Sequence, residues 1–369
     1  METAKERILK AINHVQPESV PVYILAFDPL DRWLERFQAA DPVDLRAKLG
    51  LGLQFARPIY TGPNAELGLN IWGRSVRVMG ATGAGYSSVR GDYPLAGATS
   101  VAEIDRFPWP DPDDFDYEVV AQILRSLPDD TAKSIRTVYS IQRPGQTRTA
   151  AARGLGLGSW IPLLCSVFDL VGMEEALVWL HTQPVLIEAI VAHLEAFLLG
   201  YHRRLLAATQ GLADIFDFGD DFASQAGMLI SPQHWRRFLK PTYAKIYALA
   251  KSSGLKVWVH SCGTFRPVLP DMIELGMDVW ETVQAHLPGN EPAALKREYG
   301  RDLTFFGAIS SQHTLPYGTP EAVRAEVRER IRVLGQGGGY ICGPDHTVMA
   351  DAPIENVLAL LAEATAFRF

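Results

Sequence analysis

The chain of 369 residues has few cysteines, no long apolar run and no block of like charge. Its three cysteines, Cys165, Cys262 and Cys342, are too sparse for a disulfide framework, so we expect reduced thiols that are free for metal binding or chemistry. No uninterrupted apolar stretch approaches the roughly 20 residues of a membrane span, and the N-terminus lacks the apolar core of a signal peptide. These absences predict a cytoplasmic protein.

The balance of charge excludes further classes of partner. The net charge is −7 and the isoelectric point is near 5.7, whereas nucleic acids and anionic membranes require basic patches. Apolar residues make up 47% of the chain, which is ordinary for a globular protein with a large core. We therefore expect a small-molecule substrate and a single domain over residues 1–369, because barrel domains often exceed the usual domain length.

Short β-rich runs alternate with longer helical patterns along the chain. Each run is rich in aromatic or β-branched residues and many are closed by Gly, Asp or Ser, as strands are. Strands and helices in strict alternation give parallel strands with right-handed crossovers, and eight strands predict a (β/α)8 TIM barrel. The predicted strands are Pro21–Phe27, Leu53–Tyr60, Ile135–Gln142, Asp214–Asp221, Lys256–Gly263, Asp278–Gln284, Leu303–Ser310 and Gly338–Asp345.

Two additions interrupt this pattern. An amphipathic helix precedes the first strand as an N-terminal extension, and residues 69–99 contain Gly-rich turns that predict a β-hairpin inserted after the second strand. An open, doubly wound sheet is the competing fold. That fold would place a Gly-rich phosphate turn after its first strand, and none follows Pro21–Phe27.

Candidate metal ligands lie where a barrel carries its active site, at the C-terminal ends of the strands. His260 and Cys262 are two residues apart on the fifth strand, so their side chains can point to the same side. Cys342, on the eighth strand, lies across the barrel mouth and can converge on them. One imidazole and two thiolates form a zinc-type ligand set that leaves a position open for substrate.

Glu281, at the end of the sixth strand, is a candidate for a displaceable fourth ligand or an ordinary polar residue. Zinc (Zn2+) at this point would hold a bound thiol as a thiolate or polarise a methoxy oxygen.

Other polar residues are candidates for substrate contact. Asp220 and Asp221 follow the fourth strand; adjacent residues face opposite ways, so only one can enter the mouth, and we favour Asp221. His286, His313 and His346 follow three of the last strands, and each could line the mouth or lie in a solvated loop. We name Asp221, His286 and His346 as candidate catalytic residues.

Three segments carry a family resemblance: VHSCG, LKREYGRDLTFFGAISSQHTLPYGTPEAVRAEV and GGGYICGPDHTVMADAPIENVLALLAEA. Together they resemble the uroporphyrinogen decarboxylase superfamily, most strongly over residues 210–369. The His-x-Cys pattern with a distant Cys is similar to the zinc methyltransferase branch, which includes corrinoid:coenzyme M methyltransferases and corrinoid-linked O-demethylases. The resemblance implies zinc on His260, Cys262 and Cys342, with Glu281 placed as in cobalamin-independent methionine synthase.

The same resemblance implies methyl transfer to or from the cobalt of a corrinoid on a separate partner protein. We therefore expect a zinc-dependent methyltransferase acting between a small methylated substrate and a corrinoid protein or a thiol. The alternative is a metal-free decarboxylase of a tetrapyrrole, but the arginine-rich run of that branch is replaced here by LAFDPLDRW, in which only Arg32 is close. A third hypothesis is a barrel that acts as a scaffold. The direction of transfer and the oligomeric state stay open.

Overall fold

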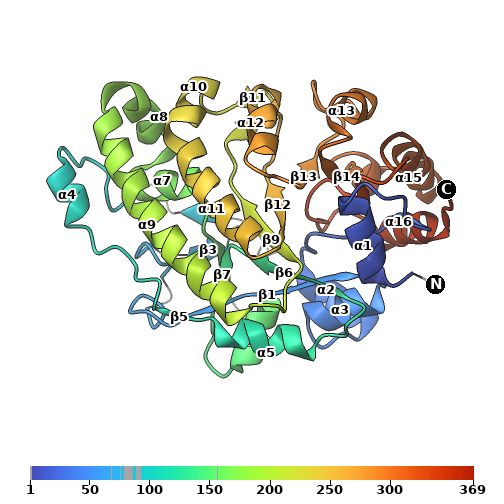
Figure 1. The fold of residues 1–369 in the computed structure, drawn as a ribbon. Helices are drawn as coiled ribbons and strands as arrows, with labels where there is room; N and C mark the ends of the chain where they lie inside the picture. Colours follow the sequence, from blue (N-terminus) through green and yellow to red (C-terminus); the bar gives the residue numbers. More distant parts are fainter. Residues whose placement is uncertain (1, 68, 75, 79–85, 89–92, 156) are drawn as a thin grey trace.

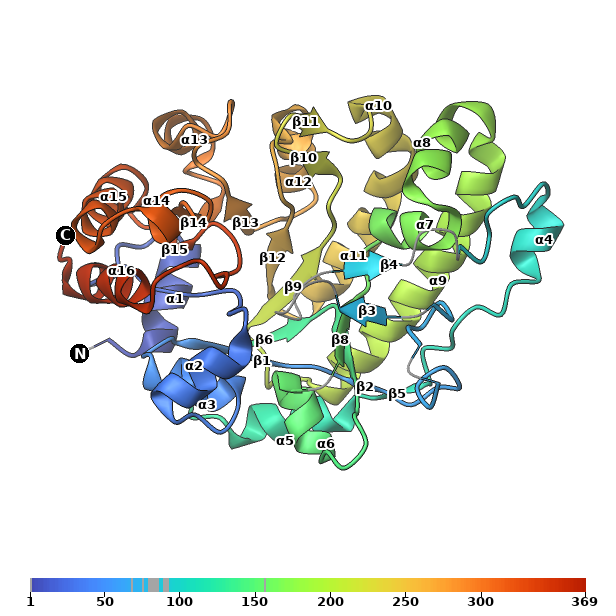
Figure 2. The same ribbon diagram turned by 180° about the vertical axis from the view of Figure 1, so that it is seen from behind.

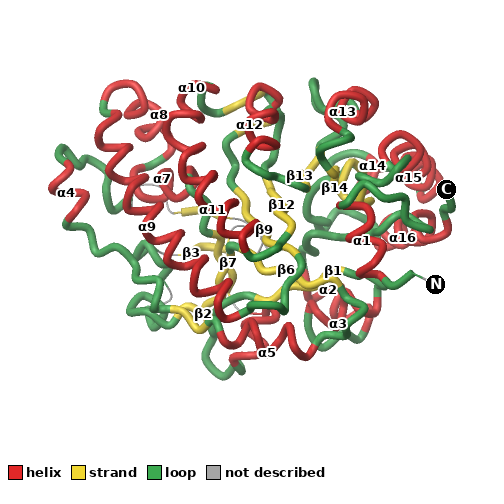
Figure 3. Tube along the Cα trace, viewed as in Figure 1, coloured by secondary structure: helices red, strands yellow, loops and turns green. Residues whose placement is uncertain are grey.

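The computed structural model describes the whole chain except residues 1, 68, 75, 79–85, 89–92 and 156. Its centre is a curled, seven-stranded parallel sheet in the order β1-β6-β9-β12-β13-β14-β15, shown in yellow in Figure 3. The order follows the sequence, as in a barrel. The strands are β1 (Leu53–Ala56), β6 (Ala132–Arg136), β9 (Ile215–Gly219), β12 (Lys256–His260), β13 (Val279–Val283), β14 (Thr304–Ile309) and β15 (Tyr340–Pro344).

Residues 21–27 occupy the eighth position of this sheet. They contact the far edge through two parallel bridges, Val22 with Cys342 and Phe27 with Val348. Each of the eight positions contributes one side chain to a buried cluster, which we call the inner cluster. Its members on the strands are Tyr23, Leu53, Ala132, Ile215, Trp258, Val279, Phe306 and Ile341. In a barrel, inward-pointing side chains from all the strands fill the interior. The predicted (β/α)8 barrel therefore fits the observed positions of these eight side chains.

Helix α1 (Ala4–Ile12) covers the N-terminal end of the strands. Its residues Ile8, Ala11 and Ile12 belong to the same inner cluster as the first residues of several strands. The carbonyl of Ala11 also accepts a hydrogen bond from the backbone of Gly339. Figures 1 and 2 show α1 beside the red C-terminal helices, so both ends of the chain lie on one side of the molecule. The inner cluster and α1 together close this end of the barrel.

Helices follow each strand and form the outer layer (Figures 1 and 2). Most are amphipathic, and they bury one face against the strands. The main ones are α2 (Leu30–Phe37), α3 (Pro42–Lys48), α5 (Glu118–Ser126), α9 (Pro184–Ala208), α11 (Lys240–Ser252), α12 (Leu269–Glu274), α13 (Pro292–Tyr299), α15 (Pro320–Leu334) and α16 (Ile354–Ala366).

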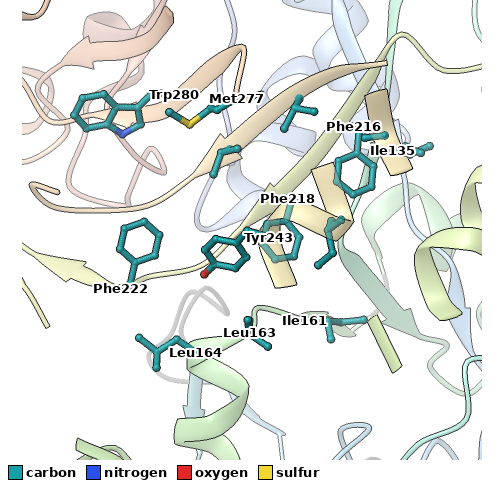
Figure 4. Close-up of a cluster of buried hydrophobic side chains, with 14 of the residues drawn as sticks. Ile135, Ile161, Leu163, Leu164, Phe216, Phe218, Phe222, Tyr243, Met277 and Trp280 are labelled. Atoms are coloured by element: carbon teal, nitrogen blue, oxygen red, sulfur yellow. The ribbon is translucent and has the colours of Figure 1, made fainter. Parts of the chain in front are cut away.

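The outer core lies between the strands and these helices. Figure 4 shows Ile135 of β6 and Phe216 and Phe218 of β9 among the side chains of this core. Their neighbour Ile215 belongs to the inner cluster, so Phe216 faces the opposite side of the sheet. Phe218 packs edge-on against Tyr243 of α11, with ring centroids 5.4 Å apart. Successive side chains of each strand therefore point alternately into the barrel interior and toward the helix layer, as strand geometry requires.

Two predicted strands are divided. Leu53–Tyr60 forms β1 and β2 (Ile59–Tyr60), and the run from 135 to 142 is divided between β6 and β7 (Val138–Ile141). The second halves join a separate sheet in the order β5-β2-β7-β8, with β5 at Phe115–Asp116 and β8 at Leu157–Trp160. Within residues 69–99, β3 (Val76–Val78) pairs antiparallel with β4 (Tyr86–Ser88), and the predicted turn lies outside the described residues.

Helix α9 is long and apolar enough to cross a membrane by length and composition alone. Nearly half of the apolar window is buried inside the structure, against α4 (Val101–Asp105), α8 (Met173–Thr182) and α11. The core helix of a folded domain satisfies the same test of length and composition.

Candidate functional site

The site is built on the inner face of β12. Trp258 belongs to the inner cluster, so His260, two residues further on, points into the barrel one layer closer to the C-terminal end. Parallel pairing sets His260 level with Gly219 of β9 and Glu281 of β13. A Cβ at Gly219 would lie 2.8 Å from the Cβ of His260 and 2.4 Å from the ring of Trp160, so glycine leaves the space that these rings occupy.

Three potential metal ligands converge at this end of the barrel. One ligand atom each of His260, Cys262 and His346 lies within 4.8 Å of the other two. The Nε2 of His260 is 3.6 Å from the sulfur of Cys262. Two donors on one tetrahedral zinc ion lie about 3.5 Å apart, so the pair of His260 and Cys262 already has the required spacing. His346 is the hydrogen-bonding neighbour of Cys262 and completes the group. Two imidazoles and a thiolate therefore fit a catalytic zinc site.

Glu281 lies behind His260 rather than beside the open position. Its Oε1 is 2.9 Å from Nδ1 of His260, and its Oε2 accepts a hydrogen bond from the indole of Trp258. The side chain of Glu281 is fully buried. A carboxylate on the far nitrogen of a ligating imidazole orients the ring toward a metal. The structure thus places Glu281 where it can orient the ring of His260, whereas the sequence predicted either a displaceable fourth ligand or an ordinary polar residue.

The structure does not bring Cys342 to this group. Its neighbour Ile341 belongs to the inner cluster, and Cys342 belongs to the outer core, because successive residues of β15 face opposite sides. Burial raises the pKa of the Cys342 thiol to about 12, and Tyr340 is its hydrogen-bonding neighbour. The predicted convergence of Cys342 on His260 is therefore corrected, and His346 takes the third position.

The adjacent acids after β9 have separate roles. Asp221 accepts a hydrogen bond from the backbone of Cys262 at 2.9 Å, and the same oxygen is 3.7 Å from Nε2 of His260. Asp220 turns away and accepts hydrogen bonds from the backbone amides of Leu164 and Cys165 at the start of α7 (Leu164–Val171). The structure thus places Asp221, and not Asp220, beside the candidate ligands.

Charges in the group favour a thiolate at Cys262. Burial opposes ionisation of this thiol, but His260 and His346 more than offset it and lower the pKa of Cys262. Burial also opposes protonation of the two rings, and their contact with the Cys262 sulfur outweighs it, so the pKa of each histidine is raised. A thiolate binds soft metal ions, and a bound metal ion would compete with protons for the two imidazole rings.

A chain of buried ion pairs extends from the group across the barrel. Arg136, the last residue of β6, is 3.4 Å from Glu281 and 2.7 Å from Asp217. Burial raises the pKa of Asp217 to about 7, whereas Arg136 and His260 more than offset burial at Glu281 and lower its pKa. Arg136 and Asp217 were not among the predicted site residues. The available signal was strand alternation, because Arg136 lies four residues after Ala132 and Asp217 two residues after Ile215, and both of those residues face inward.

His286 and His313 belong to a neighbouring network. The Nδ1 of His286 is 3.5 Å from Oδ2 of Asp345, and Ser311 donates hydrogen bonds from its backbone and hydroxyl to Oδ1 of Asp345. The rings of His286 and His313 lie 5.2 Å apart. Asp345 immediately precedes His346, so this network borders the candidate metal ligands without belonging to them.

Comparisons with known proteins agree with this architecture. The family model described as uroporphyrinogen decarboxylase (URO-D) matches residues 160–367, which is more than half of the chain. A solved methyltransferase from Methanosarcina mazei has a TM-score of 0.66 at 21% identity and covers 99% of both chains, which shows a shared fold.

A curated relative, the methylated-thiol–coenzyme M methyltransferase of Methanosarcina mazei, is 29% identical over 205 residues. That alignment covers 54% of this chain and 51% of the relative, so it spans about half the length of each protein. The match to the family model extends from β8 to the end of α16 and includes all three candidate ligands. The chain belongs to the uroporphyrinogen decarboxylase (URO-D) family.

Proposed function

We propose that this protein is a zinc-dependent methyltransferase that moves a methyl group between a small methylated substrate and a corrinoid protein or a thiol. The observation that carries the proposal is the convergence of His260, Cys262 and His346 at the C-terminal end of the barrel. The similarity to proteins named as methyltransferases supports the same reaction class.

The site residues would have two kinds of role, metal binding and orientation of the metal ligands. His260, Cys262 and His346 would hold zinc, whose Lewis acidity lowers the pKa of a thiol or polarises a methoxy oxygen. Glu281 fixes the ring of His260, and Asp221 fixes the backbone at Cys262. Three protein ligands leave one position for the substrate, which distinguishes a catalytic from a structural zinc site.

The inner cluster below the site excludes water from its floor. Trp258, directly beneath His260, is packed against Tyr23 and Phe306, with ring centroids 5.9 and 5.4 Å apart. A dry floor strengthens the electrostatic interactions of a substrate bound above it. The methyl group would be transferred at the open end, where a partner protein can approach.

The test is zinc content together with methyl transfer to cob(I)alamin, followed by its change in absorption. Cys262→Ser is expected to lose both zinc and transfer while keeping its fold, because the inner cluster does not involve the thiol. The matched variant Cys342→Ala is expected to keep both, since that thiol faces the outer core. Zinc-free wild-type protein with full activity, or zinc loss on Cys342→Ala alone, would contradict the proposal.

A further inference from the structure

Three guanidinium groups pack on a single aromatic ring inside the barrel. The ring belongs to Phe55 of β1, which points inward two residues above Leu53 of the inner cluster. The guanidinium carbons of Arg46, Arg136 and Arg57 lie 4.6, 4.8 and 5.7 Å from its centroid. Each such contact is favourable by itself, but three like charges on one ring repel each other.

Arg46 shows that the positive charge is not fully compensated by the protein. It is 5% exposed, and its Nε is buried without a hydrogen-bond partner. Its other nitrogens reach the backbone oxygens of Pro42 at 3.3 Å and Leu25 at 3.4 Å, and the hydroxyl of Tyr23 is a neutral hydrogen-bonding neighbour. No carboxylate in the described part of the chain forms an ion pair with Arg46. A buried charge without a counter-ion is costly, which points to a missing anion.

The acids around the cluster are already engaged. Asp217 and Glu281 both contact Arg136, and Glu281 also holds His260 and Trp258. Asp41 caps the start of α3 and forms an ion pair with Arg153. A second unsatisfied donor lies on the same face, because the hydroxyl of Ser134, two residues before Arg136 on β6, is buried without a partner.

The cluster lies at the same, C-terminal end of the barrel strands as the candidate metal ligands. Arg57 and Arg136 stand at the C-terminal ends of β1 and β6, where barrels bind substrates. Arg136 contacts Glu281, and Glu281 contacts His260, so a single residue connects the cluster to the ligand group. A compact molecule that contacts both would place its anionic end on the arginines and its opposite end at the ligands.

We propose that Arg46, Arg57 and Arg136 on the Phe55 ring form an oxyanion subsite that binds a carboxylate or sulfonate of the methylated substrate. This inference rests on the proposed function, since it names the chemical class of the substrate for the same site. Guanidinium forks match such oxyanions in a bidentate manner, and the Phe55 ring supplies an apolar surface for the body of the molecule.

The test measures binding of model compounds, so it needs neither zinc nor turnover. The probes are methoxyacetate, 4-methoxybenzoate, 4-methoxybenzenesulfonate and the neutral 4-methoxybenzamide, titrated by calorimetry into wild-type protein, Arg57→Gln and Arg57→Lys. At least one anion is expected to bind wild-type protein, with about 10- to 100-fold weaker binding to Arg57→Gln and a smaller loss in Arg57→Lys. The amide is expected to bind weakly and equally to all three.

The control is Arg148→Gln, which removes an exposed arginine paired with Asp116. Preference for the benzoate or for the sulfonate identifies which oxyanion the subsite takes. Binding of no anion to wild-type protein, equal binding of anion and amide, or equal binding to Arg57→Gln would overturn the inference. The comparison of anion with amide on wild-type protein decides the matter even if Arg57→Gln does not fold. Protein that takes up no zinc but still binds the anions would contradict the proposed metal chemistry through its lack of zinc, and would leave this subsite intact.

Discussion

Glu281 lies 2.9 Å from Nδ1 of His260, and the opposite nitrogen of the same ring lies 3.6 Å from the sulfur of Cys262. The imidazole is therefore held from behind by a buried carboxylate and presents its free edge to the other candidate ligands. This relationship separates the residues that would contact a metal from those that orient them.

Replacing Glu281 by Gln is expected to weaken zinc affinity by about 10- to 100-fold, because a neutral amide fixes and polarises the imidazole less well. Competition with a chromophoric chelator measures this loss directly. Glu274→Gln, which alters an exposed acid on α12, serves as the control and is expected to retain the affinity of wild-type protein. Unchanged affinity in Glu281→Gln would show that the carboxylate does not act through His260.

His346→Ala is expected to remove one ligand and reduce zinc content well below one ion per chain, with parallel loss of activity. His181→Ala, an exposed histidine of α8, is expected to bind zinc normally. Metal analysis after dialysis gives the result. Full zinc content in His346→Ala would show that a residue other than His346 is the third ligand.

Asp220 and Asp221 are adjacent but are expected to respond differently to replacement by alanine. Asp220→Ala leaves the hydroxyl of Tyr243 and two amides at the start of α7 without their acceptor, so the free energy of unfolding should fall by roughly 2–4 kcal/mol. Asp221→Ala should cost less than about 1 kcal/mol but impair activity, because it frees the backbone at Cys262. Denaturant titration and activity assays compare the two. Equal stability losses would contradict this division of roles.

Gly219→Ala is expected to displace Trp160 or His260, because the new methyl group would overlap both. Overpacking of this kind costs about 1–3 kcal/mol, and displacement of His260 should also lower zinc affinity. Gly211→Ala is the matched variant: its φ of 72° is unfavourable for alanine, but the position faces open space, so only stability should fall. Normal zinc affinity in Gly219→Ala would show that the site adapts.

His202 is expected to make the protein less stable in mild acid. Burial lowers the pKa of His202 to about 3, whereas an unfolded histidine titrates near about 6.5. Between these values the unfolded chain binds a proton that the folded protein does not, so stability falls as pH decreases, by up to about 1.4 kcal/mol per pH unit. His202→Phe should flatten this slope in denaturant titrations from pH 7.5 to 5. Thr137 keeps a partner, since its hydroxyl also reaches the carbonyl of Asp217. An unaltered slope would refute the assignment.

The alternation of strands and helices was sufficient to predict the order of the central sheet and the pairing of His260 with Cys262. The same pattern could not predict which residues of β15 point into the barrel. The β15 residues Tyr340, Ile341 and Cys342 are all buried, so no alternation of polar and apolar residues reveals which of them points inward. His346 follows the strand in a loop, and its direction depends on tertiary contacts that no local pattern encodes.

The division of the longer β-rich runs was also beyond sequence patterns. β7 leaves the barrel to pair with β8, a segment that is close only in the folded chain. Likewise Glu281 was identified as a site residue, but its place behind His260 depends on the register between β12 and β13, which local sequence does not determine.

Helix α1 closes the N-terminal end of the barrel, so the barrel is open only at the C-terminal end of its strands. Since Ile8, Ala11 and Ile12 block the N-terminal end, the methyl donor and acceptor of the proposed reaction would share a single entrance. If the proposed acceptor is a protein, a small methylated substrate near His260 would enter before that protein covers the rim, and the demethylated product would leave only after the protein dissociates. Under the proposed function, a single entrance would therefore order turnover, with the larger partner arriving last and departing first.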